Sequence, residues 1–371
     1  MKMTKKQIAL TAALLALVGS ASAQSNVTLY GILDVYYANL AVDGKATLNK
    51  LDSGAVNQSR WGMKGSEDLG GGLKANFELA AGFSMDTGAA DNGTSANTLP
   101  AVSAAFSRQS WVGFSSDSLG AVRLGRTYTP FDDQNGAADG LFDSKLSAQR
   151  QIFRTADLYG SQGYTSNFNN MVYYQAPRFA GFSAAVAFGL GEDASTTLGG
   201  ASHGTSMNVT YANGPLAAGV AYQTQVVAVG GAQSKDFTRV NAAYDFGVAK
   251  LKGSFGKAAN LPNAPATSTT VAPFGFGDAP VAGNDVSEYS VAVDYPVSAA
   301  LTLSANVAKS TASDQALLNK IDNRTGYALG ASYTLSKRTF LYGGYMTNTA
   351  TNAAGTDTAT RLVAAGVQHR F

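Results

Sequence analysis

Apolar and polar residues alternate with a period of two along most of the chain. The last segment carries the following residues on one face of an extended strand: Val363, Ala365, Val367, His369 and Phe371. The residues between them are mostly small or polar, and 27–37 and 73–83 show the same rhythm. Because successive side chains of a strand point to opposite faces, each segment predicts a strand with one apolar face. Strands of about ten residues with this alternation are typical of a transmembrane β-barrel.

Sixteen segments of this kind can be counted along the chain. They are 27–38, 57–67, 72–84, 105–116, 120–127, 169–177, 181–190, 205–213, 215–225, 236–246, 248–257, 286–296, 299–309, 325–336, 338–348 and 360–371. An even number allows an antiparallel barrel to close with both termini on one side. A barrel of this size leaves a water-filled lumen, whereas eight strands would be filled by side chains. The pattern therefore predicts an all-β, 16-stranded antiparallel transmembrane barrel with a pore.

The connections between these segments are alternately short and long. Short ones such as 68–72, 116–120 and 212–215 are rich in Gly, Asn, Asp and Pro, which supply tight turn geometry. The long ones are 39–57, 84–105, 128–168, 191–204, 226–235, 258–285, 310–324 and 349–359. This alternation indicates short periplasmic turns and long extracellular loops.

The N-terminus reads as an export signal. A basic start is followed by the apolar run 8–18 and by Ala21-Ser22-Ala23, which is a small-x-small cleavage site. The run is too short to span a bilayer as a helix, which disfavours the alternative of a membrane anchor. We expect a signal peptide at 1–23 and a single barrel domain at 24–371.

Composition limits the chemistry that the chain can support. The chain has no cysteine and two histidines far apart, His203 and His369, so thiol chemistry and a His-based metal or catalytic centre are poorly supplied. With Lys2, Lys5 and Lys6 removed in the signal, 24 basic and 25 acidic residues remain, so no basic field points to nucleic acid. We expect no cofactor, no metal and no nucleic-acid partner. On composition alone a secreted soluble β-protein remains an alternative, but 41 glycines and only 14% charged residues suit a barrel facing lipid.

Several short motifs, spread over the whole mature chain, carry a family resemblance. They are 27–31 (VTLYG), 59–73 (SRWGMKGSEDLGGGL), 107–114 (SRQSWVGF), 124–130 (LGRTYTP), 333–339 (YTLSKRT) and 366–371 (GVQHRF). In this order they resemble the general trimeric porins of Gram-negative bacteria, of the beta-proteobacterial type. The resemblance implies a homotrimer in the outer membrane, in contact with lipid and lipopolysaccharide. It also implies passive diffusion of ions and small hydrophilic solutes, and recognition of the terminal Phe371 by the barrel-assembly machinery.

The family places a constricting loop after the fifth strand, and here the connection 128–168 is the longest in the chain. A connection of about 41 residues is unusual unless it has a task. The resemblance implies that it folds into the barrel and that its acidic residues face basic residues of the wall. We expect Asp133, Asp139 and Asp143 at the narrow point, because they lie in the Gly- and Ala-rich first half. A solvated external loop is the alternative.

Basic residues of the opposite wall can be assigned from strand parity and from the family motifs. Arg60 and Lys64 share a face opposite to Trp61, so they face the lumen when Trp61 faces lipid. Arg123 also falls on the lumen face. Strict alternation would point Arg126 towards lipid, at a cost of about 2–4 kcal/mol near the midplane.

A bulge at Gly125 would switch the face of the strand, and with the family's Gly-Arg motif it assigns Arg126 to the lumen. Arg108 has the same parity difficulty and is a further candidate. The family's additional arginine before the sixth strand is missing from 164–172, and Arg150 or Arg154 could replace it.

Three other functions compete with a general channel. A barrel enzyme would need a nucleophile or an acid pair beside a histidine or metal, which this chain poorly supplies, so we expect no enzyme. A surface protein whose loops bind partners is compatible with a pore. A solute-specific channel would often show more strands or an aromatic ladder, and neither is found in the sequence.

Overall fold

The computed structural model describes residues 26–91, 105–134, 136–153, 163–191, 203–227, 233–261, 285–312, 321–352 and 355–371. The predicted signal peptide 1–23, its cleavage site at Ala23, and Arg154 lie outside the described residues. None of the helices in these ranges is long and apolar enough to cross a membrane.

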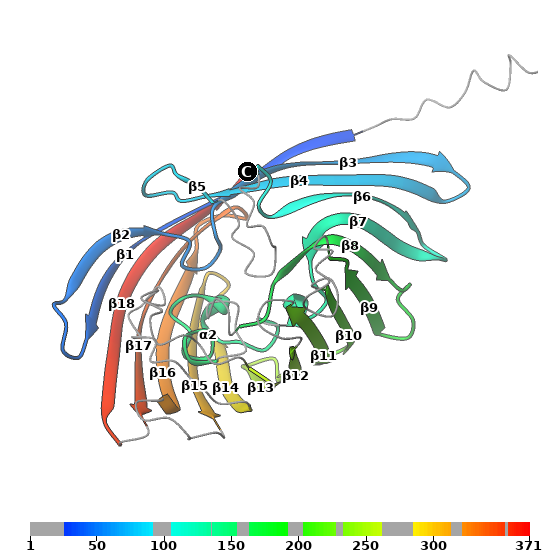
Figure 1. Ribbon diagram of the computed structural model, residues 1–371. Helices are drawn as coiled ribbons and strands as arrows, with labels where there is room; N and C mark the ends of the chain where they lie inside the picture. The colour runs from blue at the N-terminus through cyan, green and yellow to red at the C-terminus, as the bar shows by residue number, and fades with distance from the viewer. Residues whose placement is uncertain are drawn as a thin grey trace, which may run out of the picture.

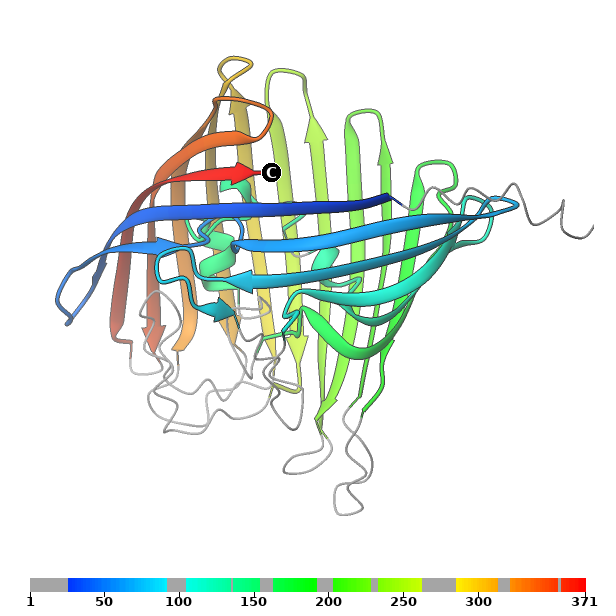
Figure 2. The same ribbon diagram turned by 90° about the horizontal axis from the view of Figure 1, so that it is seen from above.

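Sixteen strands form the wall of a closed antiparallel barrel (Figure 1). They are β1 (Asn26–Val42), β3 (Arg60–Gly70), β4 (Leu73–Phe83), β6 (Gln109–Ser116), β7 (Gly120–Tyr128), β8 (Asn167–Gln175), β9 (Phe182–Gly189), β10 (His203–Asn213), β11 (Leu216–Val227), β12 (Gln233–Asp245), β13 (Lys250–Ala259), β14 (Val286–Pro296), β15 (Leu301–Ala312), β16 (Ile321–Thr334), β17 (Thr339–Asn352) and β18 (Asp357–Arg370). Each wall strand pairs with the next, and β18 pairs with β1. The predicted fold is confirmed, and Figure 2 shows the tight hairpins of β10–β17 along one rim.

Two short strands lie inside segments that were predicted as loops. β2 (Leu48–Ser53) pairs with the second half of β1, and β5 (Ala90–Asp91) pairs with the end of β4. β1 therefore has two partners on one side, because it pairs with β3 through Ile32 and with β2 from Val35 onwards.

Burial alternates along the wall strands as the sequence pattern predicts. On β18, Leu362 and Ala364 are buried, whereas Val363 between them is 51% exposed. Because large apolar side chains such as Val363 are exposed on one face, that outer face of the barrel suits lipid. The other face carries small and polar side chains together with buried apolar ones such as Leu362.

The two ends of the chain close the barrel. β1 and β18 pair from Ile32 opposite Arg370 to Val42 opposite Thr360. Beyond this ladder, the backbone N–H groups of Gly31 and Phe371 each donate to the other residue's carbonyl at 3.1 Å. The Phe371 ring lies over Gly31, where an added Cβ would come within 2.2 Å of the ring. Phe371 is thus a structural part of the closure.

The buried carboxylate of Asp34 links the connection between β2 and β3 to the last two strands of the barrel, β17 and β18. It accepts hydrogen bonds from the backbone N–H groups of Ala55 (3.0 Å), Val56 (3.3 Å) and Asn57 (3.0 Å), from the Tyr342 hydroxyl (2.6 Å) and from Gln368 Nε2 (3.0 Å). The ladder on this side of β1 is interrupted between β2 and β3, and Asp34 satisfies backbone donors that have no strand partner there.

Candidate pore constriction

The connection after β7, the fifth wall strand, is anchored to the face of the wall that carries polar side chains. We call residues 129–134 and 136–153 the anchored segment. At its start, the Phe131 N–H donates to Ser206 Oγ (2.9 Å), and Asn208 Nδ2 donates to the carbonyl of Pro130 (2.7 Å). Asn241 Nδ2 donates to the carbonyl of Gln134 (2.5 Å). Strands β10 and β12 thus hold the segment through its backbone.

The later part of the anchored segment is held by apolar packing as well. It contains the 3-10 turn η2 (Leu141–Asp143) and the short helix α2 (Ala148–Ile152), and Figure 1 shows α2 on the concave side of β15–β17. Five buried residues of the segment belong to one apolar cluster with residues of β1, β15, β16, β17 and β18: Leu141, Leu146, Ala148, Ile152 and Phe153. A solvated external loop would leave these side chains in water, so the packing favours an inward position.

Backbone geometry at η2 reflects close contact with the wall. An added Cβ at Gly140 would come within 2.8 Å of Ala292 Cβ, so only glycine allows this approach. The next three residues, Leu141, Phe142 and Asp143, all have positive φ (50°, 65° and 53°). Such conformations cost free energy in non-glycine residues and persist only where the surrounding structure enforces them.

A polar pocket of about 440 Å³ lies between the anchored segment and strands β2, β3 and β7. Its charged lining residues are Arg60, Arg108, Lys145, Arg150, Asp52, Asp132 and Asp143. Basic and acidic groups from the wall and from the segment are thus brought together around one water-accessible space. We call this space the polar pocket.

Most of these charges are engaged by neighbours. Arg108 forms an ion pair with Asp91 (2.6 Å), and Arg150 forms one with Asp143 (3.1 Å). The Lys145 ammonium donates to the carbonyl of Ser53 at 3.0 Å, and burial lowers its pKa below that of an ordinary lysine. Arg60 differs, because within the described ranges its guanidinium has neither an ion pair nor a hydrogen bond.

Comparison with known proteins identifies the family of the chain. The family model described as "Gram-negative porin" matches residues 9–353, which is most of the chain. The chain belongs to the Gram-negative porin family. Outer membrane porin protein 32 of Delftia acidovorans is 40% identical over 258 residues, which cover 68% of each chain. An outer membrane porin protein of Bordetella pertussis is 30% identical over 410 residues, covering 99% of this chain and all of that one.

Solved structures of other proteins have the same fold. The anion-selective porin from Comamonas acidovorans matches with a TM-score of 0.72 and 26% identity, covering 94% of this chain and 100% of that chain. A trimer form of the outer membrane protein OmpT of Vibrio cholerae matches with a TM-score of 0.62 over 94% of this chain and 99% of that chain, at 15% identity. This chain is therefore a porin of a Gram-negative outer membrane, and its barrel forms a channel for passive diffusion.

The predicted site residues of the porin separate into groups. Arg60, Arg108 and Asp143 line the polar pocket, whereas Lys64 and Arg123 line a second pocket that shares no lining residue with it. Asp133 lies at the start of the anchored segment, exposed and within electrostatic reach of Arg123.

Arg126 lies beside the polar pocket because of an irregular ladder. The pairing of β7 with β8 shifts register between Gly125 and Thr127, and Gly125 has a φ of 131°. The irregularity predicted at Gly125 is therefore present. Arg126 shares parity with Tyr128, a lining residue of the polar pocket, and donates to the carbonyl of Ser107 (2.9 Å) and to Asn169 Oδ1 (2.5 Å).

Asp139 does not line the polar pocket, because its side chain is only 2% exposed. Its Oδ1 accepts from Ser147 Oγ (2.6 Å) and Asn306 Nδ2 (3.0 Å). Oδ2 has no hydrogen-bond partner among the residues that the structure describes. We expected this aspartate to face the lumen, but it anchors the segment to β15. Its neutral polar partners Ser147 and Asn306 can accommodate a buried carboxyl group, and no pattern in the sequence indicates that they would lie beside it.

Three further lining residues were not singled out by the sequence pattern. Lys145 and Asp132 are two of the many charged residues of the connection 128–168, and Asp52 lies in the predicted loop 39–57. Parity gives no signal outside a strand, so only the path of the anchored segment could select them. Arg150, one of the two residues that could replace the missing family arginine, lines the pocket.

The anchoring of the segment is expected to weaken as pH rises. Burial, together with the Asp143 carboxylate, raises the pKa of Asp139 to about 8, and Arg150 and Lys252 oppose that rise. In a released segment the pKa would return to about 4. The equilibrium constant for anchoring is then largest at acid pH. It falls between about pH 4 and pH 8, by at most about tenfold per pH unit.

Hydrogen exchange of the segment, corrected for intrinsic rates, would measure this effect. Asp139→Asn is neutral at every pH and should give protection that does not change between pH 5 and pH 8. Asp117→Asn, in an exposed turn, should behave as the wild type does. Equal pH dependence in Asp139→Asn and wild type would contradict the assignment.

Proposed function

We propose that ions and small hydrophilic solutes cross this porin through a constriction at the polar pocket, with a weak preference for anions. The observation that carries the proposal is that the Arg60 guanidinium, which has no ion pair or hydrogen bond among the residues that the structure describes, faces a segment that bears carboxylates. Four basic and three acidic side chains line the pocket, an excess of one positive charge. The similar structure from Comamonas acidovorans is that of an anion-selective porin, which supports the same direction.

The proposed mechanism is a transverse field that acts without tight binding. Two unit charges about 10 Å apart interact by roughly 0.4 kcal/mol at the dielectric constant of water and roughly 1.7 kcal/mol at an effective value of 20. Energies of this size orient a polar solute and favour one sign of ion. They remain small enough for the solute to leave, which conduction requires.

Four associated proposals follow from the family. The porin is a homotrimer, as the trimer form of OmpT supports, and it catalyses no reaction, since members of its family are porins. Its lipid-facing surface meets lipopolysaccharide, and Phe371 acts as a signal for the barrel-assembly machinery. Unchanged assembly of a chain lacking Phe371 would contradict the last of these, and a monomer in crosslinking experiments would contradict the first.

Conductance in a planar bilayer tests the function directly. Purified porin should insert in steps of three equal conductances that scale with salt concentration, and a potassium chloride gradient should give a reversal potential of the sign for anion preference. Folded protein that leaves the bilayer silent would overturn the channel. A reversal potential favouring potassium would overturn only the anion preference.

A further inference from the structure

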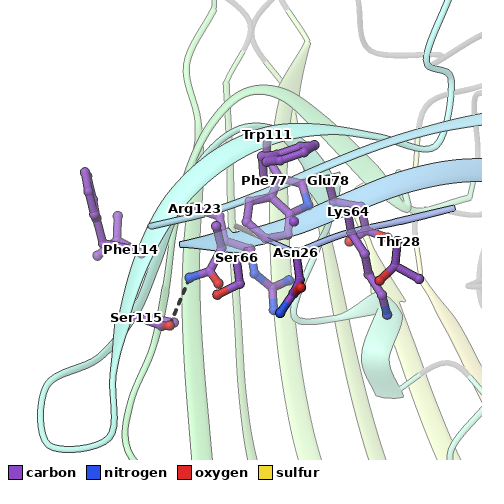
Figure 3. A pocket seen from close by; sticks show the side chains of 14 residues that line it. Asn26, Thr28, Lys64, Ser66, Phe77, Glu78, Trp111, Phe114, Ser115 and Arg123 are labelled. Carbon is purple, nitrogen blue, oxygen red and sulfur yellow. Dashed lines mark hydrogen bonds between the residues drawn. The ribbon is translucent and has the colours of Figure 1, made fainter. Parts of the chain in front are cut away.

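A second group of charged side chains lies on the wall away from the polar pocket. Strands β3, β4, β6 and β7 contribute Lys64, Glu78, Trp111 and Arg123 to a pocket of about 410 Å³ (Figure 3). These side chains come from neighbouring strands, since Lys64 is opposite Glu78 and Glu78 is opposite Trp111. We call them, with the rings of Tyr30 and Tyr173, the Arg123 cluster.

Strand register places the Arg123 cluster on the lumen side of the wall. Arg123 is opposite Tyr173, and the same row continues through Ala187 to Ser206, which accepts the hydrogen bond from the anchored segment. Residues of opposite parity, Val112 and Phe114, are 56% and 49% exposed on the outer face. Arg123 therefore meets the solution that fills the channel.

Two aromatic rings hold the Arg123 guanidinium. Its Cζ lies 5.0 Å from the centre of the Trp111 ring and 4.9 Å from that of Tyr173. The diagonal contact with Trp111 has room because Arg123 is opposite Gly113 and Trp111 is opposite Gly125. Stacking fixes the plane of the guanidinium but uses none of its N–H donors.

The donors of both cations remain available. Within the described ranges, Arg123 and Lys64 form neither hydrogen bonds nor ion pairs with side chains or backbone. The Lys64 ammonium lies 5.4 Å from the centre of the Tyr30 ring. A guanidinium that is already oriented can form two parallel hydrogen bonds to a carboxylate or phosphate with little loss of entropy.

Two carboxylates moderate the positive charge. Glu78 lines the same pocket and accepts a hydrogen bond from the Tyr30 hydroxyl, and Asp133 interacts electrostatically with Arg123. With two cations and two carboxylates the site has no net formal charge, so the oriented N–H donors attract an anion without retaining it, which suits a station on a diffusion path.

We propose that Arg123 and Lys64 form an oxyanion-binding station on the lumen wall, distinct from the constriction, which takes the carboxylate or phosphate groups of permeating solutes. The inference rests on the proposed channel function and adds a solute class to it. Chloride offers only one acceptor atom and cannot form two parallel hydrogen bonds with the guanidinium fork, so the station favours oxyanions over chloride beyond the effect of charge alone.

Bi-ionic reversal potentials of the folded trimer test the station, with acetate and inorganic phosphate each compared with chloride. Arg123→Lys keeps the charge but removes the fork. It should leave the chloride-to-potassium permeability ratio unchanged and lower the oxyanion preference by roughly threefold to tenfold, the effect of one lost charge-assisted hydrogen bond partly screened by water. Lys64→Gln should lower both the chloride-to-potassium permeability ratio and the oxyanion preference, each by a smaller factor of about twofold. Lys74 is exposed and lies on the same face of β4 as Glu78. Lys74→Gln therefore controls for the loss of a positive charge and should leave the oxyanion preference unchanged.

The outcomes separate this inference from the channel itself. A loss confined to acetate supports a carboxylate station, and a loss confined to phosphate supports a phosphate station. An oxyanion preference that is absent in the wild type, or equal in Arg123→Lys and wild type, overturns the station while the channel stands. If Arg123→Lys fails to fold, an oxyanion preference in Lys64→Gln equal to that of the wild type would likewise overturn the station. A silent bilayer would instead overturn the channel.

Discussion

Replacing Asp34 with alanine should destabilise the barrel by at least about 3 kcal/mol, because hydrogen bonds to a buried charged group each contribute about 1.5–3 kcal/mol and their donors would be left unsatisfied. Asp34 is fully buried and accepts five hydrogen bonds from three parts of the chain. Urea unfolding in detergent, followed by the loss of the folded band in gel electrophoresis, would measure the change.

Asp34→Asn sharpens this prediction without changing side-chain size. Oδ1 accepts from Ala55 and Tyr342, while Oδ2 accepts from Val56, Asn57 and Gln368. Either orientation of an amide would therefore turn its NH₂ group towards other donors, and the variant should also be destabilised. Asp117→Ala, in the exposed turn between β6 and β7, should unfold like the wild type. An unfolding midpoint of Asp34→Ala equal to that of the wild type would refute the role.

Replacing Arg60 with alanine should lower the permeability of an anion by about twofold to twentyfold, the range given by removing one charge about 10 Å from a permeating ion, and the anion-to-cation permeability ratio by at least as much. Arg60 should have a larger effect than Arg108, because Arg108 is already paired with Asp91. Reversal potentials in a potassium chloride gradient would measure the ratio.

Two further variants control the Arg60 result. Asp143→Asn removes the opposite charge from the same pocket and should raise the ratio. Arg361→Ala removes an exposed arginine that is paired with Asp43 (3.1 Å) and does not line the pocket, so selectivity should not change. A ratio in Arg60→Ala that equals the wild-type value would show that the polar pocket does not control selectivity.

The sequence assigns both Arg126 and Arg60 to the lumen wall, but the structure separates the two. Arg126 donates to the carbonyl of Ser107 and to Asn169 where β7 and β8 change register. Its removal would disturb this irregular ladder as well as the field, so Arg60 gives the cleaner measurement.

Sequence reasoning succeeded where the relevant signal was local. The sixteen predicted segments all coincide with wall strands, with ends that differ by a few residues. The irregularity at Gly125 was also predictable, because strict alternation would have pointed Arg126 towards lipid. β2 and β5 could not be predicted in the same way, since they are short and gain stability mainly by pairing with β1 and β4.

The residues of the constriction were predicted only in part. Asp139 was expected beside the lumen but is buried, because Ser147 and Asn306 provide a polar site for it between the anchored segment and the wall. The composition of a loop shows which charges are present. It does not show which of them will meet the wall, since that depends on partners such as Asn306, which lies 167 residues away in sequence from Asp139.

The sequence by itself determined the class of the protein, the number of wall strands and the face on which most side chains of those strands lie. These properties depend on a two-residue period that each strand carries independently. The tertiary structure alone decided which charges line the polar pocket, how Arg123 is held between two rings, and how Asp34 joins Tyr342 across 308 residues. Such contacts depend on closure of the barrel and on the path of the anchored segment, and no local pattern in the chain specifies either.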